Sequence, residues 1–311
     1  MNMIDEVINI TQNSSYGKAF WDSMRTDRWD EEILNKGKAH GVSAYFAPEG
    51  LRERIRKEVA KCDSLRALAS SHKHYKGHVD FLSAANEDYA EFIADGEMIP
   101  GYDMTDDFTK MCAELHKAAV LVKAPTEFVY DASFDIEGYL ARSMAKAFVR
   151  AEDKAFINGT GVKEPTGLLH DTNGADIGTS VDTITYDSII DLFFSVKPEY
   201  RKNAVWIMND ATALVLRKLK DKDGNYLWNQ ATDTILGKKV VISNEMPDAE
   251  SGKKPVIFGD ISYYWIVDRS PISIKALKEV FAANDQIGYV GYEFLDARLV
   301  RSEAVKVLGI K

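Results

Sequence analysis

The stretch that decides the fold is SFDIEGYLARSMAKAFVRAEDKAFING, residues 133–159. Ser133 is a suitable N-cap, and Asp135 places negative charge in the first turn, where the helix dipole favours it. The pair Asn158-Gly159 at the far end is of a kind that commonly terminates a helix. The pattern therefore predicts one long helix over residues 133–158.

The two sides of this predicted helix differ in character. Arg142, Lys146 and Arg150 recur at i, i+4 and i+8 and so lie together on one side. A charged stripe is most often only the solvated side of a helix, so the stripe by itself does not establish a binding surface. The opposite side is expected to collect the apolar residues Ile136, Leu140, Met144, Ala147, Phe148, Ala151 and Ala155.

An acidic segment precedes the helix, at residues 79–108. It contains nine Asp and Glu residues and no Lys or Arg, while the rest of the chain has 39 of each sign, so this segment accounts for the whole net charge of −9. It also carries large apolar side chains, which a merely solvated loop rarely does. Two interpretations stay open: a charged hairpin folded back on its own domain, or an arm that lies on another subunit. The residues considered for such an arm are Phe81, Glu87, Asp88, Tyr89, Glu91 and Phe92.

The rest of the chain alternates between helical and strand patterns. The helix-like YDSIIDLFFSV is followed by the strand-like AVWIMN, KKVVISN, PVIFGD and YYWIVD, and the chain closes with two long strands and a short one. This order is not a regular βαβ series, so we expect an α+β fold. The 311 residues suffice for one large domain or two modest ones. No Gly/Ser-rich or Pro-rich linker divides them, so the parts should be interleaved along the chain.

Composition and charge exclude several classes of protein. A hydrophobic fraction of 45% is ordinary for a globular protein, and an acidic net charge is unsuited to neutralising nucleic-acid phosphates. Cys62 and Cys112 are far apart and fit neither a disulfide framework nor a zinc site. The first residues, MNMIDEVINITQ, lack a signal-peptide pattern, and no apolar run approaches the ~18 residues of a membrane span. We therefore expect a cytosolic protein without a membrane partner.

No motif for catalysis or cofactor binding stands out. The Gly-x-Gly at 158–161 follows a helix instead of opening one, which is the wrong geometry for holding a phosphate. The run DKDGN at 221–225 lacks the glutamate that closes a calcium loop, and a turn is the better interpretation. His72, His74 and His78 do not have the spacing of metal ligands. We expect no catalytic residue, no cofactor and no metal site, and hence not an enzyme.

Three motifs, in order along the chain, resemble one protein family. In the first, a helix with a paired Arg150 and Glu152 near its end runs into Asn-Gly-x-Gly and then Pro-x-Gly at 158–167. The second combines a strand, Met-Asn, a helix and Lys-Asp-x-x-Gly-x-Tyr-Leu-Trp over 205–228. The third is spread over 236–308. Together they are similar to the tailed-phage major capsid proteins of the Hong Kong 97 type.

The resemblance implies a fold and a division of the chain. That family has a peripheral domain built on a long spine helix and a long-stranded sheet, an axial domain, an N-terminal arm and an extended loop. Here these parts would be the arm at 1–45, the peripheral domain at 46–78, 109–185 (with the spine helix at 133–158) and 279–296, the extended loop at 79–108, and the axial domain at 186–278 and 297–311.

The resemblance also implies a function. The chain would be a virion protein of a tailed phage or prophage, self-assembling as pentamers and hexamers of an icosahedral shell that encloses double-stranded DNA without sequence-specific binding. Its partners would be further copies of itself, a scaffolding protein, a portal and a maturation protease, with assembly in the bacterial host cytoplasm.

Two departures from the family change these expectations. Many relatives begin with a long scaffolding segment, whereas this chain enters the arm almost at once, so a separate scaffold or the short first helix is expected to serve. Some relatives form Lys–Asn cross-links between subunits, but the acidic loop here contains no lysine, so we expect non-covalent contacts in that loop.

The charges lead to an interface hypothesis. The acidic loop of one subunit would lie on the spine helix of its neighbour, with its carboxylates against Arg142, Lys146 and Arg150 and its aromatic side chains burying apolar area. Three other functions stay open. They are an encapsulin-like nanocompartment shell, an unrecognised soluble enzyme and, least favoured because no basic patch with interleaved aromatics occurs, a nucleic-acid-binding protein.

Overall fold

The structure is a computed structural model, and it describes residues 14–26, 45–62, 64–74, 79–84, 108–220, 226, 228 and 233–311. The chain divides into two compact units that alternate along the sequence, in keeping with the absence of a linker. Unit 1 comprises Met1–Leu68, Leu115–Ala155 and Asp268–Leu295, and unit 2 comprises Ala69–Glu114, Phe156–Val267 and Asp296–Lys311.

The predicted long helix is present as α6 (Ile136–Asn158). Its start differs from the prediction, because Asp135 and not Ser133 caps it: Asp135 Oδ1 accepts a hydrogen bond from the Gly138 N–H at 3.0 Å. Ser133 instead donates its N–H and its hydroxyl to Asp131 Oδ1, at 2.8 and 2.7 Å. These two bonds lower the pKa of Asp131. The sequence pattern located the helix correctly and misplaced its cap.

The Asn-Gly-x-Gly and Pro-x-Gly motifs form the turn that ends α6. The chain returns toward the helix so that the Gly167 N–H donates to Gly159 O at 2.9 Å and the Leu168 N–H donates to Phe156 O at 2.7 Å. A Cβ atom at Gly167 would lie 2.4 Å from the Gly159 nitrogen, so only glycine fits there. Gly161 has φ +74°, a conformation that favours glycine. The motif is therefore a structural requirement of the turn.

The buried face of α6 is rotated slightly from the predicted one. Ala151 was expected in the core, but it is exposed, and Ala147 is only half-buried. Ala145 and Val149 are buried in their place. The predicted face assumed a regular repeat of apolar side chains, whereas the core of unit 1 also takes up Ala141 and Ala145, which lie beside the predicted face.

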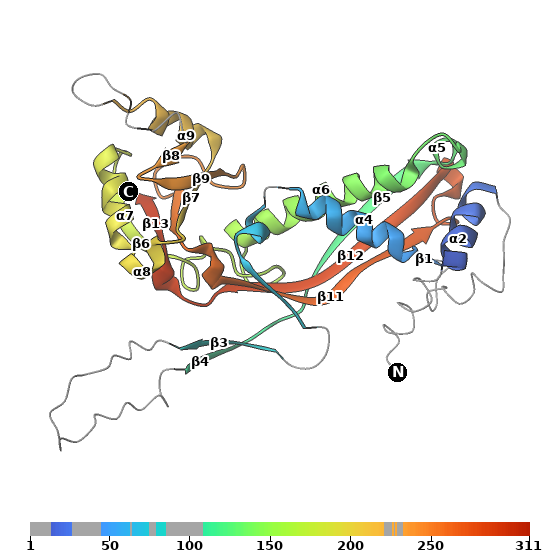
Figure 1. Ribbon diagram of the computed structural model, residues 1–311, viewed down its shortest axis with the longest axis horizontal. Coiled ribbons are helices and arrows are strands. Elements are labelled where there is room, and N and C mark those ends of the chain that lie inside the picture. The colour runs from blue at the N-terminus through green and yellow to red at the C-terminus, as the bar shows by residue number, and fades with distance from the viewer. Residues whose placement is uncertain are drawn as a thin grey trace, which may run out of the picture. The chain divides into compact units, whose positions relative to one another are not determined.

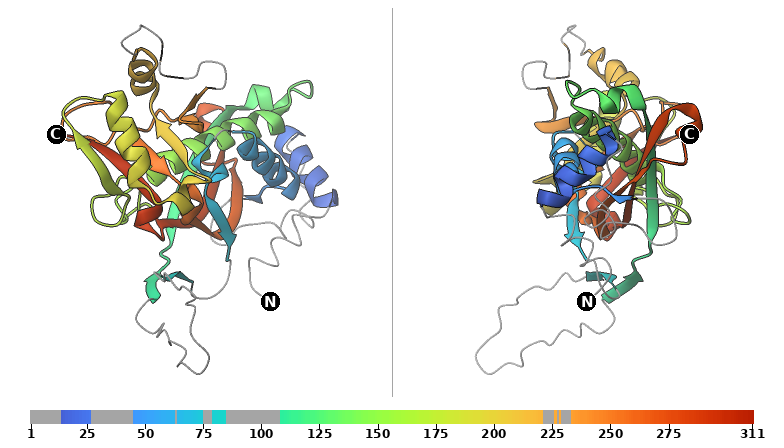
Figure 2. Two further views of the ribbon diagram at one scale, coloured as in Figure 1. Left: turned by 60° about the vertical axis from the view of Figure 1, so that its left-hand side comes forward. Right: turned by 90° about the vertical axis from the view of Figure 1, so that its right-hand side faces the viewer.

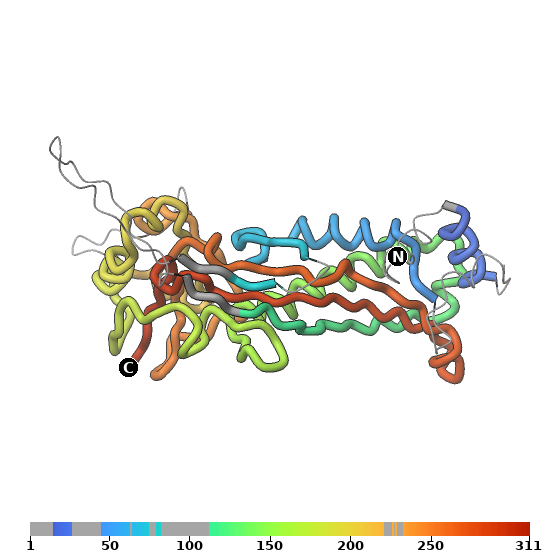
Figure 3. The backbone as a smooth tube through the Cα atoms, turned by 90° about the horizontal axis from the view of Figure 1, so that it is seen from below, coloured from blue at the N-terminus to red at the C-terminus, as the bar shows by residue number. Residues whose placement is uncertain are grey.

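Unit 1 is built on a sheet of long strands with the order β1-β11-β12-β5. The strands are β1 (Tyr45–Phe46), β5 (His116–Pro125), β11 (Tyr264–Leu277) and β12 (Gln286–Leu299). Strands β12 and β5 pair antiparallel from Gln286↔Pro125 to Leu295↔His116. Figure 3 shows these strands running side by side, and Figure 1 shows α6 and α4 (Glu49–Ala60) along the same sheet.

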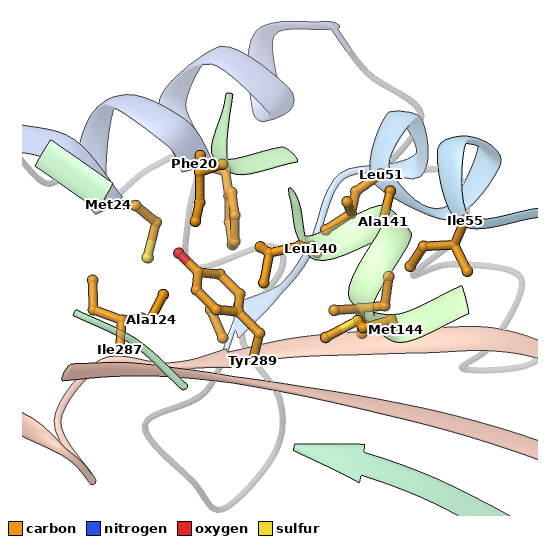
Figure 4. Close-up of a cluster of buried hydrophobic side chains, with 14 of the residues drawn as sticks. Phe20, Met24, Leu51, Ile55, Ala124, Leu140, Ala141, Met144, Ile287 and Tyr289 are labelled. Carbon is orange, nitrogen blue, oxygen red and sulfur yellow. The ribbon is translucent and has the colours of Figure 1, made fainter. Parts of the chain in front are cut away.

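The core of unit 1 lies between this sheet and three helices. Helix α2 (Ser14–Thr26) closes one end of it, beside the short α5 (Thr126–Tyr130). Tyr289 of β12 is fully buried and lies among side chains of α2 and α6 (Figure 4). Burial of such apolar side chains contributes ~1.5–3 kcal/mol each to folding. The surrounding buried residues include Phe20, Met24, Leu51, Ile55, Leu140, Met144 and Ile287.

Unit 2 is built on a six-stranded sheet with the order β6-β13-β10-β7-β9-β8. Its central strand β10 is buried at every position, with antiparallel neighbours on both sides. The ring of Trp206 stacks on that of Phe258, with 4.0 Å between the ring centroids. Its indole N–H donates a hydrogen bond to Ile235 O at 3.0 Å. Figure 2 gives two further views. The elements are β6 (Asp176–Val181), α7 (Tyr186–Ser195), α8 (Pro198–Arg201), β7 (Val205–Met208), α9 (Asp210–Arg217), β8 (Thr234–Ile235), β9 (Lys238–Ile242), β10 (Val256–Gly259) and β13 (Val305–Ile310).

The ends of the acidic segment form a two-stranded ribbon, β3 (Asp80–Ala84) with β4 (Phe108–Cys112). Phe81 was considered as a contact to another subunit, and this expectation is wrong. Its side chain is 1% exposed and packs against Val267 and Val300 of its own chain, so it has no surface to offer a neighbour. Phe81 instead anchors the ribbon on unit 2.

The remaining described elements are short. Among the described residues, no helix is both long and apolar enough to cross a membrane. The short elements are η2 (Leu65–Ala67), β2 (Ser70–Lys73), which pairs with β11, η3 (Ile261–Tyr263), η4 (Ala282–Asn284) and η5 (Ser302–Ala304).

Candidate functional site

The predicted basic stripe lies on the exposed side of α6. Arg142, Lys146 and Arg150 are all exposed, because the opposite side of the helix faces the core of unit 1. Within the described part of the chain, none of the three forms an ion pair. The stripe is therefore a row of three uncompensated positive charges. Successive members are spaced by about 6 Å along the helix axis, because four residues of a helix rise by that distance.

A groove of about 480 Å³ between α4 and α6 extends this positive surface. Arg142 lines it from α6, and α4 contributes Arg54, Lys57 and Lys61. Helix α4 buries Leu51 and Ile55 in the core and so turns its basic side chains toward this groove. The sequence analysis identified the stripe but not the contribution of α4, since the two helices meet only in the folded chain.

Carboxylates neutralise the groove only in part. Arg54 lies 3.4 Å from both Asp135 and Glu137, and Lys61 lies 2.6 Å from Glu58. Exposed ion pairs of this kind contribute only ~0.2–1 kcal/mol each. Among the described residues, Lys57 has no carboxylate within ion-pair distance. The groove and the stripe together therefore present a surface suited to an acidic partner.

The acidic residues proposed to meet this surface lie outside the described residues. They are Glu87, Asp88, Tyr89, Glu91 and Phe92.

Arg150 and Glu152, which stand close together in the first sequence motif, have different surroundings in the structure. Arg150 is exposed, whereas Glu152 is 4% exposed and accepts hydrogen bonds from Arg66 Nε and Nη2 at 2.8 and 2.5 Å. Two positions along a helix point about 200° apart, so the two side chains face different surroundings. No local signal identified Arg66 as the partner, because it lies 86 residues away in the sequence.

The second sequence motif also has a structural role. Asn209 caps α9, with its Oδ1 accepting from the Thr212 N–H at 2.7 Å. Its amide donates to Asp248 Oδ1 at 2.6 Å and so ties the cap to a distant loop. Trp228 donates its indole N–H to Asp233 Oδ1 at 3.0 Å. These hydrogen bonds stabilise unit 2.

The described residues bring together no group of three side chains that could hold a metal ion. The chain at 158–161 follows α6, as predicted, and forms the turn described above. The DKDGN run at 221–225 lies outside the described residues.

Comparison with known proteins gives consistent results. The sequence model of the phage capsid family matches residues 43–310. The probable major capsid protein gp17 of Mycobacterium phage L5 is 28% identical over 152 residues, which cover 47% of this chain and 46% of that protein. The chain thus spans about half the length of the curated relative that it matches.

Solved structures are similar over most of the chain. One is the capsid of a native GTA particle computed with C5 symmetry, which matches this chain with a TM-score of 0.65 and 29% sequence identity. The match covers 79% of this chain and 89% of the GTA capsid chain. A chain of Microbacterium phage Oxtober96 has a TM-score of 0.59 and 19% identity, with 81% and 93% covered, and supports the fold alone.

Proposed function

The chain belongs to the phage capsid family, and from this premise we propose that it is the major capsid protein of a tailed bacteriophage or prophage. It self-assembles into pentamers and hexamers of an icosahedral shell that encloses double-stranded DNA. The observation that carries the proposal is the family match over residues 43–310, joined by the likeness to the GTA capsid at 29% identity. The long α6 and the long-stranded sheet of unit 1 support it further.

In this proposal unit 1 is the peripheral domain and unit 2 the axial domain, from which the extended loop departs. The boundaries then differ from those expected from the sequence. Residues 69–78, 109–114, 156–185 and 296 join the axial domain, and residues 268–278 join the peripheral domain. The partners are other copies of the chain, a scaffolding protein, a portal and a maturation protease, and the shell assembles in the bacterial host cytoplasm.

Shell formation is tested by negative-stain microscopy and sedimentation of the purified protein, alone and co-expressed with its neighbouring genes. We expect capsomer rings or closed shells in at least one condition. A stable, monodisperse monomer or dimer in both conditions would contradict the proposal.

We propose further that the acidic segment 79–108 of one subunit lies against the basic stripe and groove of a neighbour. Charge complementarity supports this: the segment holds nine carboxylates and no base, and the exposed face of α6 holds Arg142, Lys146 and Arg150. Exposed ion pairs are weak individually at ~0.2–1 kcal/mol, so the charges set the position of the contact while Tyr89 and Phe92 add buried apolar area.

The contact is tested by reversing two charges, in the double variant Arg142→Glu with Lys146→Glu. We expect a lower yield of shells and dissociation at lower salt than for the wild type. The matched control is Lys202→Glu with Lys218→Glu, which makes the same change in net charge at exposed positions of unit 2. Equal yield and equal salt resistance in the two double variants would exclude charge pairing at the stripe.

A further inference from the structure

Four ionisable side chains meet inside unit 1, each from a different element. Arg66 of η2 holds the carboxylate of Glu152 on α6 with two hydrogen bonds, at 2.8 and 2.5 Å. The same guanidinium donates through Nη1 to Asp268 of β11 at 3.0 Å. Glu293 of β12 completes the group, because it lies close enough to Glu152 and Arg66 for the charges of both to act on its carboxyl group and shift its pKa.

A hydrogen bond between the neighbouring carboxyl groups of Glu152 and Glu293 would require a proton. Two ionised carboxylates have only acceptor atoms, so one of the two must be protonated for them to bond. The donors of Arg66 are directed at Glu152 and Asp268, and among the described residues Arg66 donates no hydrogen bond to Glu293. Glu293 is 5% exposed, and its Oε1 has no hydrogen-bond partner within the described part of the chain. Glu293 is therefore the carboxyl group that holds the proton.

The charge balance of the cluster leads to the same assignment. Three ionised carboxylates around one guanidinium would leave two uncompensated negative charges in a buried place, which is strongly unfavourable. Burial, and next the charge of Glu152, raise the pKa of Glu293 well above its ordinary value, while Arg66 opposes them. From β5, Ala118 stands opposite Glu293 in the sheet and His116 stands opposite Leu295, and from β11 the charge of Asp268 also raises the pKa of Glu293.

The position of the cluster indicates its role. Each of its four residues lies within three positions of a boundary of unit 1, namely at Leu68, Ala155, Asp268 and Leu295. The cluster thus joins four segments of chain close to the points where they leave unit 1. Strands β11 and β12 are already paired in the sheet, and the side-chain bonds of Arg66 join the ends of η2 and α6 to them.

We propose that Glu293 and Glu152 share one proton, and that this acid pair, held by Arg66, is a pH-dependent lock on the four chain segments that leave unit 1. Removing the proton breaks the hydrogen bond between the two carboxyl groups and places a second uncompensated negative charge in the cluster. The lock therefore loosens as the pH rises, and the boundary ends of η2, α6, β11 and β12 open more often.

The sign and size of the effect follow from proton linkage. When a carboxyl group has a raised pKa in the folded state, the stability it contributes is complete below the ordinary carboxyl pKa. That stability is lost as the pH rises toward the raised pKa. For a single proton, the equilibrium constant for opening rises by up to ~tenfold per pH unit over that range.

The test is hydrogen exchange of the purified protein as a function of pH, corrected for the intrinsic exchange rate of the amides. A suitable reporter is the Leu65 N–H, which donates to Asp153 Oδ1 at 3.0 Å beside the cluster. In the wild type we expect the opening constant at Leu65 to rise with pH. In Glu293→Gln, which is isosteric with the protonated acid, we expect it to stay flat.

The matched control is Glu127→Gln, which removes an exposed carboxylate of the same unit and should keep the wild-type slope. Equal slopes in the wild type and Glu293→Gln would overturn the proposal. Should Glu293→Gln fail to fold, infrared spectroscopy of the wild type decides: the carbonyl band of a buried protonated carboxyl group should be present at neutral pH and disappear on alkaline titration. Absence of that band at neutral pH would also overturn it.

Discussion

Gly167→Ala should destabilise the protein through the turn that ends α6. The new Cβ would lie 2.4 Å from the Gly159 nitrogen and 2.5 Å from the Ile157 oxygen, both of them backbone atoms that cannot swing aside. If the turn keeps its shape, overpacking of this kind costs ~1–3 kcal/mol. If the turn opens, it gives up the bonds Gly167 N–H to Gly159 O, Leu168 N–H to Phe156 O and Leu169 N–H to Ile157 O, each contributing ~0.5–1.5 kcal/mol.

Both routes lower the free energy of unfolding by at least ~1 kcal/mol. In denaturant unfolding followed by tryptophan fluorescence, this loss should appear as a lower denaturant midpoint with an unchanged dependence on denaturant concentration. The matched control is Gly50→Ala in the first turn of α4, where a Cβ meets nothing within 4 Å. There the same substitution should stabilise by up to ~1 kcal/mol, because alanine favours the helix. A Gly167→Ala variant as stable as the wild type would refute the account of the turn.

Three further predictions concern single side chains. Met144→Ala removes a fully buried side chain of α6 and should cost ~2–5 kcal/mol of unfolding free energy. Thr185→Ala deletes the acceptor of the Ser188 N–H in the capping box of α7 and should cost ~0.5–2 kcal/mol in the same assay. Tyr200→Phe removes the hydroxyl that donates to Glu303 at 2.7 Å, the largest cause of the lowered pKa of Glu303. An NMR titration of the variant should find the pKa of Glu303 nearer its usual value. Acidification should then reduce the free energy of unfolding of the variant less than that of the wild type.

The features that the sequence alone determined depend on neighbouring residues. The 3.6-residue period predicted α6 and the exposed stripe of Arg142, Lys146 and Arg150, and both are present. The glycines at 158–167 indicated a turn after that helix, which the structure contains. In each case the relevant interactions act within a few residues along the chain, so their pattern is visible in the order of the amino acids.

Only the tertiary structure decided which distant side chains meet. Phe81 belongs to the core of its own chain because Val267 and Val300 are brought to it. Glu152 binds Arg66, which lies 86 residues away, and the cluster includes Asp268, 202 residues from Arg66. Local periodicity separates the buried side of a helix from the exposed one, but the partner of a buried charge is set by the packing of whole elements, and that information is spread over the entire chain.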